Sequence, residues 1–438
     1  VGVYWIASNL LTIGQQLLLN AIIDPKKYVD YEALHQSKAE LAKINSLSSH
    51  VSKEDKQREK ADYKRFFSIA NKHLVFYSES SGFYKYFQNI IEALLARSNV
   101  VIHYITSDPK DQIFRIAQEQ PRIKPYYIGE KRLITLMMKM DADIVVMTMP
   151  DLENYHIKRS YVRKDVEYIY VFHGVISGLR TLRPGALDHF DTLLSVGDYL
   201  DREVRMVEER NHTKEKRLVP CGYGVVDNMA AAYAAIEEKE DEDPYVLIAP
   251  SWQESNILES CLIPLCQQIL GVGYRVIVRP HPQYLRRFPQ KFEQIMQECA
   301  KLPADRFEMQ TDFSSNDTVF RAALLVTDWS SIGYEYALAT RKPVLFINTP
   351  MKVVNPQIAE MEKNYESFDL QMRKVMGASL ELDEVAKQAG QAAKQLIADR
   401  DCYREVIQRV REQHIYNFGT SGLHGAHYII SALKSKKE

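Results

Sequence analysis

From residue 73 onward the chain alternates short apolar runs with amphipathic stretches, and this alternation narrows the folds that it can adopt. Short apolar runs that end in polar residues predict buried strands, and apolar residues at helical spacing predict helices. Strands that alternate with short helices favour a parallel, doubly wound α/β sheet. The first series of predicted strands lies at residues 73–77, 100–105, 126–128, 144–147, 169–172 and 192–196, and residues 217–220 close this half.

An acidic run at residues 237–244 interrupts the pattern, and a second series of strands follows it. Charged runs of this kind separate domains. We therefore expect Rossmann-like domains at residues 73–240 and 241–415, and a terminal helix within residues 416–438 that packs back on the first domain. Strands are predicted at residues 245–249, 274–278, 307–309, 324–326 and 344–347, and exposed helices at residues 358–375 and 382–397.

The N-terminal stretch, residues 1–23, contains no charged side chain and is long enough to cross a bilayer as a helix. Polar residues such as Asn9 and Gln15 interrupt it, so a partly buried soluble helix is the alternative. The stretch resembles the last transmembrane helix of YidC-type membrane protein insertases, and Lys26 and Lys27 would follow on the cytoplasmic side. Because the resemblance is confined to this helix, it implies a membrane anchor and no insertase activity.

Residues 24–72 are rich in charges of both signs and predict a linker between this helix and the first domain. Within the linker, residues 53–65 are expected as a solvated helix or a flexible tether. A surface helical hairpin fits the same pattern.

Charge and cysteine usage exclude some classes of function. The formal net charge is −1 over 438 residues, so no global positive field would attract nucleic acid. The cysteines show no CxxC spacing, which favours reduced, buried thiols over a disulfide framework or a metal site. These cysteines are Cys221, Cys261, Cys266, Cys299 and Cys402.

Polar residues follow two predicted strands of the second half. Arg279 and His281 follow one strand, and Asp328, Ser330 and Ser331 follow another, just before a predicted helix. The carboxyl ends of parallel strands face one crevice, so these side chains should meet there. Serines at the first turn of a helix offer hydroxyls and free N–H groups to an anion, and Arg279 offers a planar cation. The pattern predicts a phosphate or diphosphate site.

Four motifs resemble those of the CDP-glycerol glycerophosphotransferases of teichoic acid synthesis. They are residues 172–174 (Phe-His-Gly), 249–252 (Ala-Pro-Ser-Trp), 279–282 (Arg-Pro-His-Pro) and 327–331 (Thr-Asp-Trp-Ser-Ser), in this order, within a similarity over residues 75–433. The resemblance implies a GT-B fold, in which two Rossmann-like domains face a cleft. It further implies transfer of glycerol phosphate from CDP-glycerol to a hydroxyl of a lipid-linked acceptor at the cytoplasmic face of the membrane, with release of CMP.

The resemblance also implies roles for these residues. His173 would be the general base and His281 would neutralise or protonate the leaving phosphate. Ser330 and Ser331 would bind the diphosphate and Arg279 would clamp it. Substrate contacts are further expected from Gly174, Ser251, Trp252, Thr327 and Asp328. No protein-bound metal or other cofactor is required by these motifs, although Mg²⁺ carried by the diphosphate is compatible with them.

The chain departs from the family in its first half. Where relatives commonly continue Thr-Pro-Leu-Lys after the His-Gly pair, residues 175–178 read Val-Ile-Ser-Gly. A second motif of the relatives contains a Pro and an Arg, and this chain has neither at the corresponding residues 222–227. Arg180, Arg183 and residues 214–217 are candidates to replace the lost positive charge. The donor half thus matches the family and the acceptor half is altered.

Two other functions are compatible with the sequence. A nucleotide-sugar glycosyltransferase of the same architecture would form a glycosidic bond and use a UDP-sugar. A non-enzymatic membrane-assembly module would depend on residues 1–71 and would be insensitive to the motifs.

Overall fold

The computed structural model describes residues 9, 11–15, 18–19, 52–70, 72–236, 243–313, 315–351 and 354–436. Most of the predicted membrane helix and of the linker lies outside these residues. Among the described residues, no helix has the length and apolar character needed to cross a membrane.

The first domain is built on a parallel sheet that contains seven strands within the described residues, in the order β3-β2-β1-β4-β5-β6-β7. Helices α4 and α20 pack on one face of this sheet, and α3, α6 and α8 pack on the other. The strands are β1 (Lys72–Ser78), β2 (Ile102–Thr106), β3 (Ile123–Tyr127), β4 (Ala142–Met147), β5 (Glu167–Val171), β6 (Thr192–Ser195) and β7 (Arg217–Pro220). The helices are α3 (Lys53–Phe67), α4 (Tyr84–Arg97), α5 (Ile113–Glu119), α6 (Glu130–Met138), α7 (Gly178–Thr181), α8 (Asp198–Asn211) and α9 (Gly224–Ala234).

The second domain repeats this design with six parallel strands among the described residues, in the order β10-β9-β8-β11-β12-β13. The strands are β8 (Tyr245–Ile248), β9 (Arg275–Val278), β10 (Phe307–Met309), β11 (Leu324–Thr327), β12 (Val344–Asn348) and β13 (Gly377–Glu381). The helices are α10 (Ile257–Ser260), α11 (Leu262–Gly271), α12 (Pro282–Arg287), α13 (Pro289–Cys299), α14 (Asp317–Arg321), α15 (Ile332–Thr340), α16 (Ile358–Met361), α17 (Phe368–Val375) and α18 (Leu382–Ala398).

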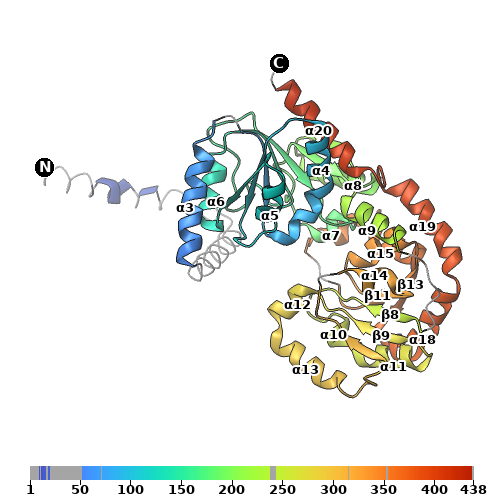
Figure 1. Cartoon of the computed structure of the whole chain (residues 1–438). Helices are drawn as coiled ribbons and strands as arrows, with labels where there is room; N and C mark the ends of the chain where they lie inside the picture. Colours follow the sequence, from blue (N-terminus) through green and yellow to red (C-terminus); the bar gives the residue numbers. More distant parts are fainter. Residues whose placement is uncertain are drawn as a thin grey trace.

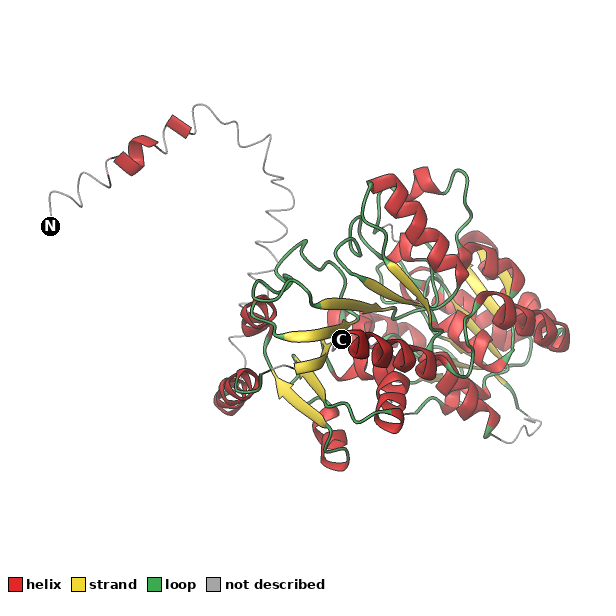
Figure 2. Cartoon of the chain, turned by 90° about the horizontal axis from the view of Figure 1, so that it is seen from above, coloured by secondary structure: helices red, strands yellow, loops and turns green. Residues whose placement is uncertain are grey.

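The chain crosses between the domains a second time near its end. Helix α19 (Arg400–His414) packs against α15 and α18, and α20 (Ser421–Ser435) then packs against α4 of the first domain. Both helices run along the edge that joins the two domains (Figure 1). The two sheets lie in separate halves of the molecule, as the view from above shows (Figure 2). The prediction of two doubly wound domains is confirmed.

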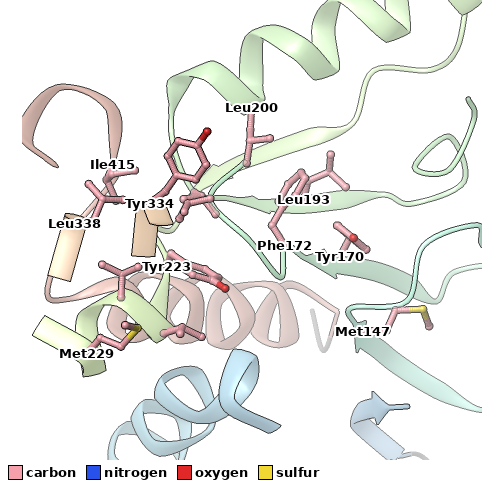
Figure 3. Packing of buried hydrophobic residues seen from close by; sticks show 14 of the residues in the cluster. Met147, Tyr170, Phe172, Leu193, Leu200, Tyr223, Met229, Tyr334, Leu338 and Ile415 are labelled. Atoms are coloured by element: carbon pink, nitrogen blue, oxygen red, sulfur yellow. The ribbon is translucent and has the colours of Figure 1, made fainter. Parts of the chain in front are cut away.

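A continuous apolar cluster joins the two domains. Tyr223 and Met229 of the α9 region pack toward Tyr334 and Leu338 of α15, and Ile415 closes the cluster after α19 (Figure 3). Burial of this much apolar surface stabilises one arrangement of the domains. The interface therefore fixes how the strand ends of one sheet face those of the other.

Some local predictions were wrong. Residues 358–375 form two short helices instead of one exposed helix, and Phe368 and Met372 are buried. Helix α18 forms as predicted and is exposed on one face, but its other face, which includes Val385 and Leu396, is buried against the second sheet. Strand β13 was not predicted.

Helix α3 forms where a solvated helix or tether was expected, but it is packed on the first domain. Its Phe66 is fully buried, with its ring 5.2 Å from that of Tyr126. The carboxylate of Asp62 accepts a hydrogen bond from the backbone N–H of Tyr127 at 2.9 Å. The helix therefore belongs to the domain, although its charges suggest a linker.

Candidate functional site

The ends of β5, β8, β9 and β11 meet at a solvent-open cleft between the domains. Seven of the ten predicted site residues line it: His173, Gly174, Ser251, Trp252, His281, Ser330 and Ser331. Arg279, Thr327 and Asp328 do not. Each half of the molecule thus contributes one histidine to the same cavity.

His281 is held by the start of α12. It is the residue that caps this helix, and its Nδ1 accepts a hydrogen bond from the backbone N–H of Gln283 at 3.1 Å. In a neutral imidazole the other nitrogen then carries the proton. Burial, and secondly the charge of Lys85, lower the pKa of His281 to about 4. His281 is therefore a neutral hydrogen-bond donor through Nε2 at neutral pH.

His173 follows β5 in the first domain and lies among aromatic rings. Its ring centroid is 5.9 Å from that of Tyr86 and 6.4 Å from that of Phe83. Its Nδ1 lies 3.3 Å from the hydroxyl of Tyr170, and either group can be the donor. Burial, and secondly the charge of Lys85, lower the pKa of His173 to about 4. The imidazole is therefore neutral and able to accept a proton.

Asp328 was predicted to contact substrate, but its carboxylate is fully buried and organises the loops around it. It accepts hydrogen bonds from the backbone N–H groups of Ser251 and Trp329, both at 2.8 Å, and from that of Ile257 at 3.3 Å. Thr327 is also buried, and its hydroxyl donates to the carbonyl of Ala249 at 2.6 Å. These two residues position the loops that carry Ser251 and Ser330.

Ser330 and Ser331 precede α15, and no side-chain hydrogen bond caps this helix. The hydroxyl of Ser331 donates to the buried carboxylate of Glu335 at 3.1 Å. Across the cleft, a Cβ placed on Gly174 would lie 3.8 Å from the Cβ of Ser331. The missing side chain at Gly174 leaves space directly in front of the helix N-terminus. The buried hydroxyl oxygen of Ser251 has no hydrogen-bond partner within the described part of the chain.

Arg279 does not reach the cleft. Its guanidinium lies 3.5 Å from the side-chain oxygens of Thr318 and Asn316, and its Cζ is 5.5 Å from the centroid of Phe313. The start of α14 therefore draws this side chain away from the position expected of a diphosphate clamp. In this structure Arg279 does not act on the cavity that the histidines line.

Sequence reasoning missed several residues of the first domain that surround His173. Lys85 and Tyr86 come from the first turn of α4, and the Lys85 Nζ lies 5.0 Å from the centroid of Tyr86. Tyr86 stacks on Tyr223, whose hydroxyl donates to Glu335 at 3.1 Å. No motif marks these residues. A charged residue within the first turn of a helix that follows a strand end is the one local signal.

Glu79 lies just beyond β1, and burial, followed by the charge of Glu130, raises its pKa to about 7. Despite such carboxylates, no group of three or more His, Cys, Asp or Glu residues with metal-binding geometry occurs in the described ranges.

Two parallel-sheet domains whose strand ends meet at a cleft define a GT-B-type transferase architecture, and solved structures share it. The wall teichoic acid polymerase TagF has a TM-score of 0.54 at 14% identity, covering 92% of this chain and 98% of that one. A putative UDP-N-acetylglucosamine 2-epimerase from Listeria monocytogenes has a TM-score of 0.54 at 13% identity, with 84% and 97% covered. At these identities the likeness shows the fold alone.

The sequence itself places the chain in a family. The model of the CDP-Glycerol:Poly(glycerophosphate) glycerophosphotransferase family matches residues 60–353, well over half of the chain. A comparison with curated proteins gave no match. The chain belongs to this family and is a glycerophosphotransferase-like enzyme, so the non-enzymatic alternative is wrong.

Proposed function

We propose that this enzyme transfers glycerol phosphate from CDP-glycerol to a hydroxyl of a lipid-linked acceptor and releases CMP, in the synthesis of a teichoic-acid-like or capsular polymer. One observation carries the proposal. Two neutral histidines, His173 and His281, line one cleft with the uncapped N-terminus of α15. A base, a hydrogen-bond donor and an anion site are what phosphoryl transfer to a hydroxyl requires.

The donor diphosphate lies at the second domain in this proposal. The backbone N–H groups at the start of α15 and the hydroxyls of Ser330 and Ser251 donate to its oxygens, where the helix dipole favours negative charge. His281 donates from Nε2 to the phosphate that leaves with CMP. Because this histidine is neutral, it stabilises developing charge by hydrogen bonding instead of by an ion pair.

The acceptor approaches from the first domain. His173 accepts the proton of the acceptor hydroxyl, whose oxygen then attacks the phosphorus that carries glycerol. The new P–O bond forms as the bond to the bridging oxygen breaks, and that electron pair leaves with CMP. For His173 to act as a base at Nε2, its Nδ1–H must donate to the oxygen of Tyr170, which lies at hydrogen-bonding distance.

No protein-bound metal or other cofactor is part of the proposal. A Mg²⁺ ion chelated by the donor diphosphate would lower its charge, and added EDTA tests for this ion. Membrane attachment through residues 1–23, at the cytoplasmic face, is likewise proposed, because a lipid-linked acceptor must be met at a bilayer. Sedimentation with vesicles of the full chain and of a chain lacking these residues tests the attachment.

The decisive experiment measures CMP release from CDP-glycerol by the full chain in detergent, with and without a lipid that carries a glycerol phosphate primer. CDP-ribitol and UDP-N-acetylglucosamine are compared under the same conditions. Acceptor-dependent CMP release that is lost in His173→Ala supports the proposal. Turnover of the UDP-sugar alone would overturn it and favour a nucleotide-sugar glycosyltransferase.

A further inference from the structure

The charged residues of the cleft balance one another. Among the described residues that line the cleft, Arg180 of the first domain is the one arginine or lysine, and Asp369 of the second domain is the one carboxylate. The Nε of Arg180 lies 3.3 Å from Oδ2 of Asp369. Its Nη2 donates at 2.5 Å to Glu362, which does not line the cleft. The described part of the cleft surface therefore offers no cation whose charge is unbalanced.

The loop after His173 adds no positive charge to the cleft. Where relatives commonly have a lysine, this chain has Gly178, which lines the cleft. The backbone N–H of Gly178 donates at 2.8 Å to the buried carboxylate of Glu203. Arg183 and residues 214–217, the other candidates to replace the charge, do not line the cleft. The charge that the sequence lacks at this position is therefore not restored by these residues.

A charge-balanced cleft limits what can bind beside the donor. The donor diphosphate is placed at the N-terminus of α15, where N–H groups and hydroxyls compensate its charge. An acceptor that ends in a chain of glycerol phosphates would bring further negative charge into the same cleft. Like charges repel more strongly where water is partly excluded, and basic side chains usually compensate them. The described surface therefore favours an acceptor whose end is uncharged.

Asp369 supplies a contact that an uncharged end rich in hydroxyls would need. It lies in the first turn of α17, and only 5% of the residue is exposed. Arg180 engages Oδ2, whereas the buried Oδ1 has no hydrogen-bond partner within the described residues. A buried polar atom without a partner is costly, so its presence on the cleft indicates a ligand. Because an ionised carboxylate only accepts hydrogen bonds, a hydroxyl is a donor that fits.

Two aromatic residues that line the cleft are held by α17, the helix that carries Asp369. The hydroxyl of Tyr334 donates to the backbone carbonyl of Asp369 at 3.0 Å. The guanidinium carbon of Arg373, in α17, lies 4.1 Å from the ring centroid of Trp329. The Nε1 of Trp329 donates to the carbonyl of Thr349 at 2.7 Å. Fixed aromatic rings with a few polar groups suit a ligand that has apolar faces and hydroxyl edges, as a sugar has.

We propose that Asp369 binds a hydroxyl of the acceptor through Oδ1, and that the acceptor ends in an uncharged sugar and not in a chain of glycerol phosphates. In the proposed function, on which this inference rests, His173 takes the proton of the hydroxyl that attacks phosphorus. The hydroxyl bound by Asp369 is a second one, which keeps its proton and orients the sugar. Asp369 lies beyond residues 60–353, so the family match assigns it no role.

The first test compares acceptors in the CDP-glycerol assay with the full chain. Dodecyl glycosides of glucose, galactose and N-acetylglucosamine are compared with the same glycosides after one glycerol phosphate has been added to each. For the best glycoside, kcat/KM is expected to be at least about 10-fold higher than for its glycerol phosphate form, because unbalanced like charges are costly at a binding surface. Equal values, or CMP release with the glycerol phosphate forms alone, would overturn the inference and leave the proposed function standing.

The second test uses two matched variants. Asp369→Asn and Glu362→Gln each remove one negative charge beside Arg180, but only Asp369 lines the cleft. In Asp369→Asn the amide oxygen is drawn to Arg180, so an NH₂ group replaces Oδ1 and the site loses its acceptor atom. The KM for the best glycoside should rise about 10- to 100-fold while the KM for CDP-glycerol is unchanged.

Glu362→Gln keeps its hydrogen bond to Arg180 through the amide oxygen, so the KM for the glycoside should change less than about 2-fold. Equal changes in the two variants would mean that the carboxylates only join the domains, and would overturn the inference.

A binding measurement separates this inference from the proposed function. Methyl glycosides of the same sugars are added to the substrate-free full chain, and their binding is followed by saturation-transfer NMR. Binding that is lost in Asp369→Asn, in an enzyme that releases no CMP with any acceptor, would mean that the sugar site stands and the proposed function fails. Absence of both binding and CMP release would overturn the two together.

Discussion

The two walls of the cleft are built in different ways. The wall from the second domain consists of loops fixed by backbone hydrogen bonds to a buried carboxylate, that of Asp328. The wall from the first domain consists of side chains, with Tyr86, Tyr170 and Lys85 around His173. A wall defined by backbone contacts depends on a few motif residues. A wall defined by side chains can change its specificity while the fold stays the same.

The motifs follow the same division, because they are kept in the second domain and altered in the first. In the proposed function the donor is held by helix ends and loop N–H groups, whose geometry depends on a few short motifs. In the same proposal the acceptor meets residues from α4, α7 and the loop after His173. We expect substitutions on the two walls to have separable effects.

The largest effect is expected from the histidines. His173→Ala should lower acceptor-dependent CMP release by about 10²- to 10⁴-fold, the range for loss of a general base, with CDP-glycerol affinity unchanged. His281→Ala should also slow the release of CMP to water in the absence of acceptor, because it acts on the leaving group. Rates with and without acceptor, together with donor affinity by calorimetry, separate the two. Equal effects of both variants on donor hydrolysis would contradict the assignment of His173 to the acceptor and His281 to the leaving group.

The next effect is on stability. Asp328→Ala removes the acceptor of several buried N–H groups and should lower the free energy of unfolding by about 3 kcal/mol, since unsatisfied buried donors are costly. It should also abolish donor binding, because the loops of Ser251 and Trp329 lose their common anchor. Urea denaturation measures the first and calorimetry the second. The exposed Asp305→Ala serves as the matched control, and an equally small change in both variants would count against an organising role.

The fold and the wall from the second domain could be predicted from the sequence because both have local signatures. Strands such as β8 and β11 are apolar runs with polar ends, and the serines before α15 precede an apolar helix. Strand β13 has no such signature. Its sequence is Gly-Ala-Ser-Leu-Glu, and it forms because Gly377 allows close approach to the backbone of Val344. Edge strands of this kind depend on tertiary contact.

The surroundings of His173 in the first domain could not be predicted because these residues meet only through the tertiary structure. Lys85 and His173 are distant in sequence, and nothing in the sequence orients their side chains toward one another. Arg279 shows the reverse case. Its motif indicates a clamp, but Asn316 and Thr318 of the α14 region lie beside it and turn it away. A motif predicts the backbone position of a residue, whereas its neighbours in the tertiary structure determine the orientation of its side chain.

A smaller effect is expected where the walls approach each other most closely. Gly174→Ala would place a methyl group 3.8 Å from Ser331, an ordinary contact, so the free energy of unfolding should change by less than about 0.5 kcal/mol. If the diphosphate occupies this space, the methyl group should lower kcat/KM about 10-fold through misplacement of the donor. Gly271→Ala, where a Cβ meets no neighbour, is the control. Full activity in Gly174→Ala would show that the substrate does not pass between the walls.

The smallest expected effect is that of mild acid on the rate. Both histidines have pKa values lowered to about 4, chiefly by burial, so they should remain neutral at pH 5.5 and kcat/KM should change less than about 2-fold from pH 7. A base with the usual histidine pKa would lose about 10-fold. Stability should respond differently. Between the usual pKa and about 4 the unfolded chain binds protons that the folded protein does not, so the free energy of unfolding should fall as the pH falls through this window. Rate profiles measured alongside urea denaturation at each pH distinguish the two. A loss of rate centred near pH 6.5, with stability intact, would mean that the catalytic histidine is exposed to solvent and is not buried beside Tyr86 and Tyr170.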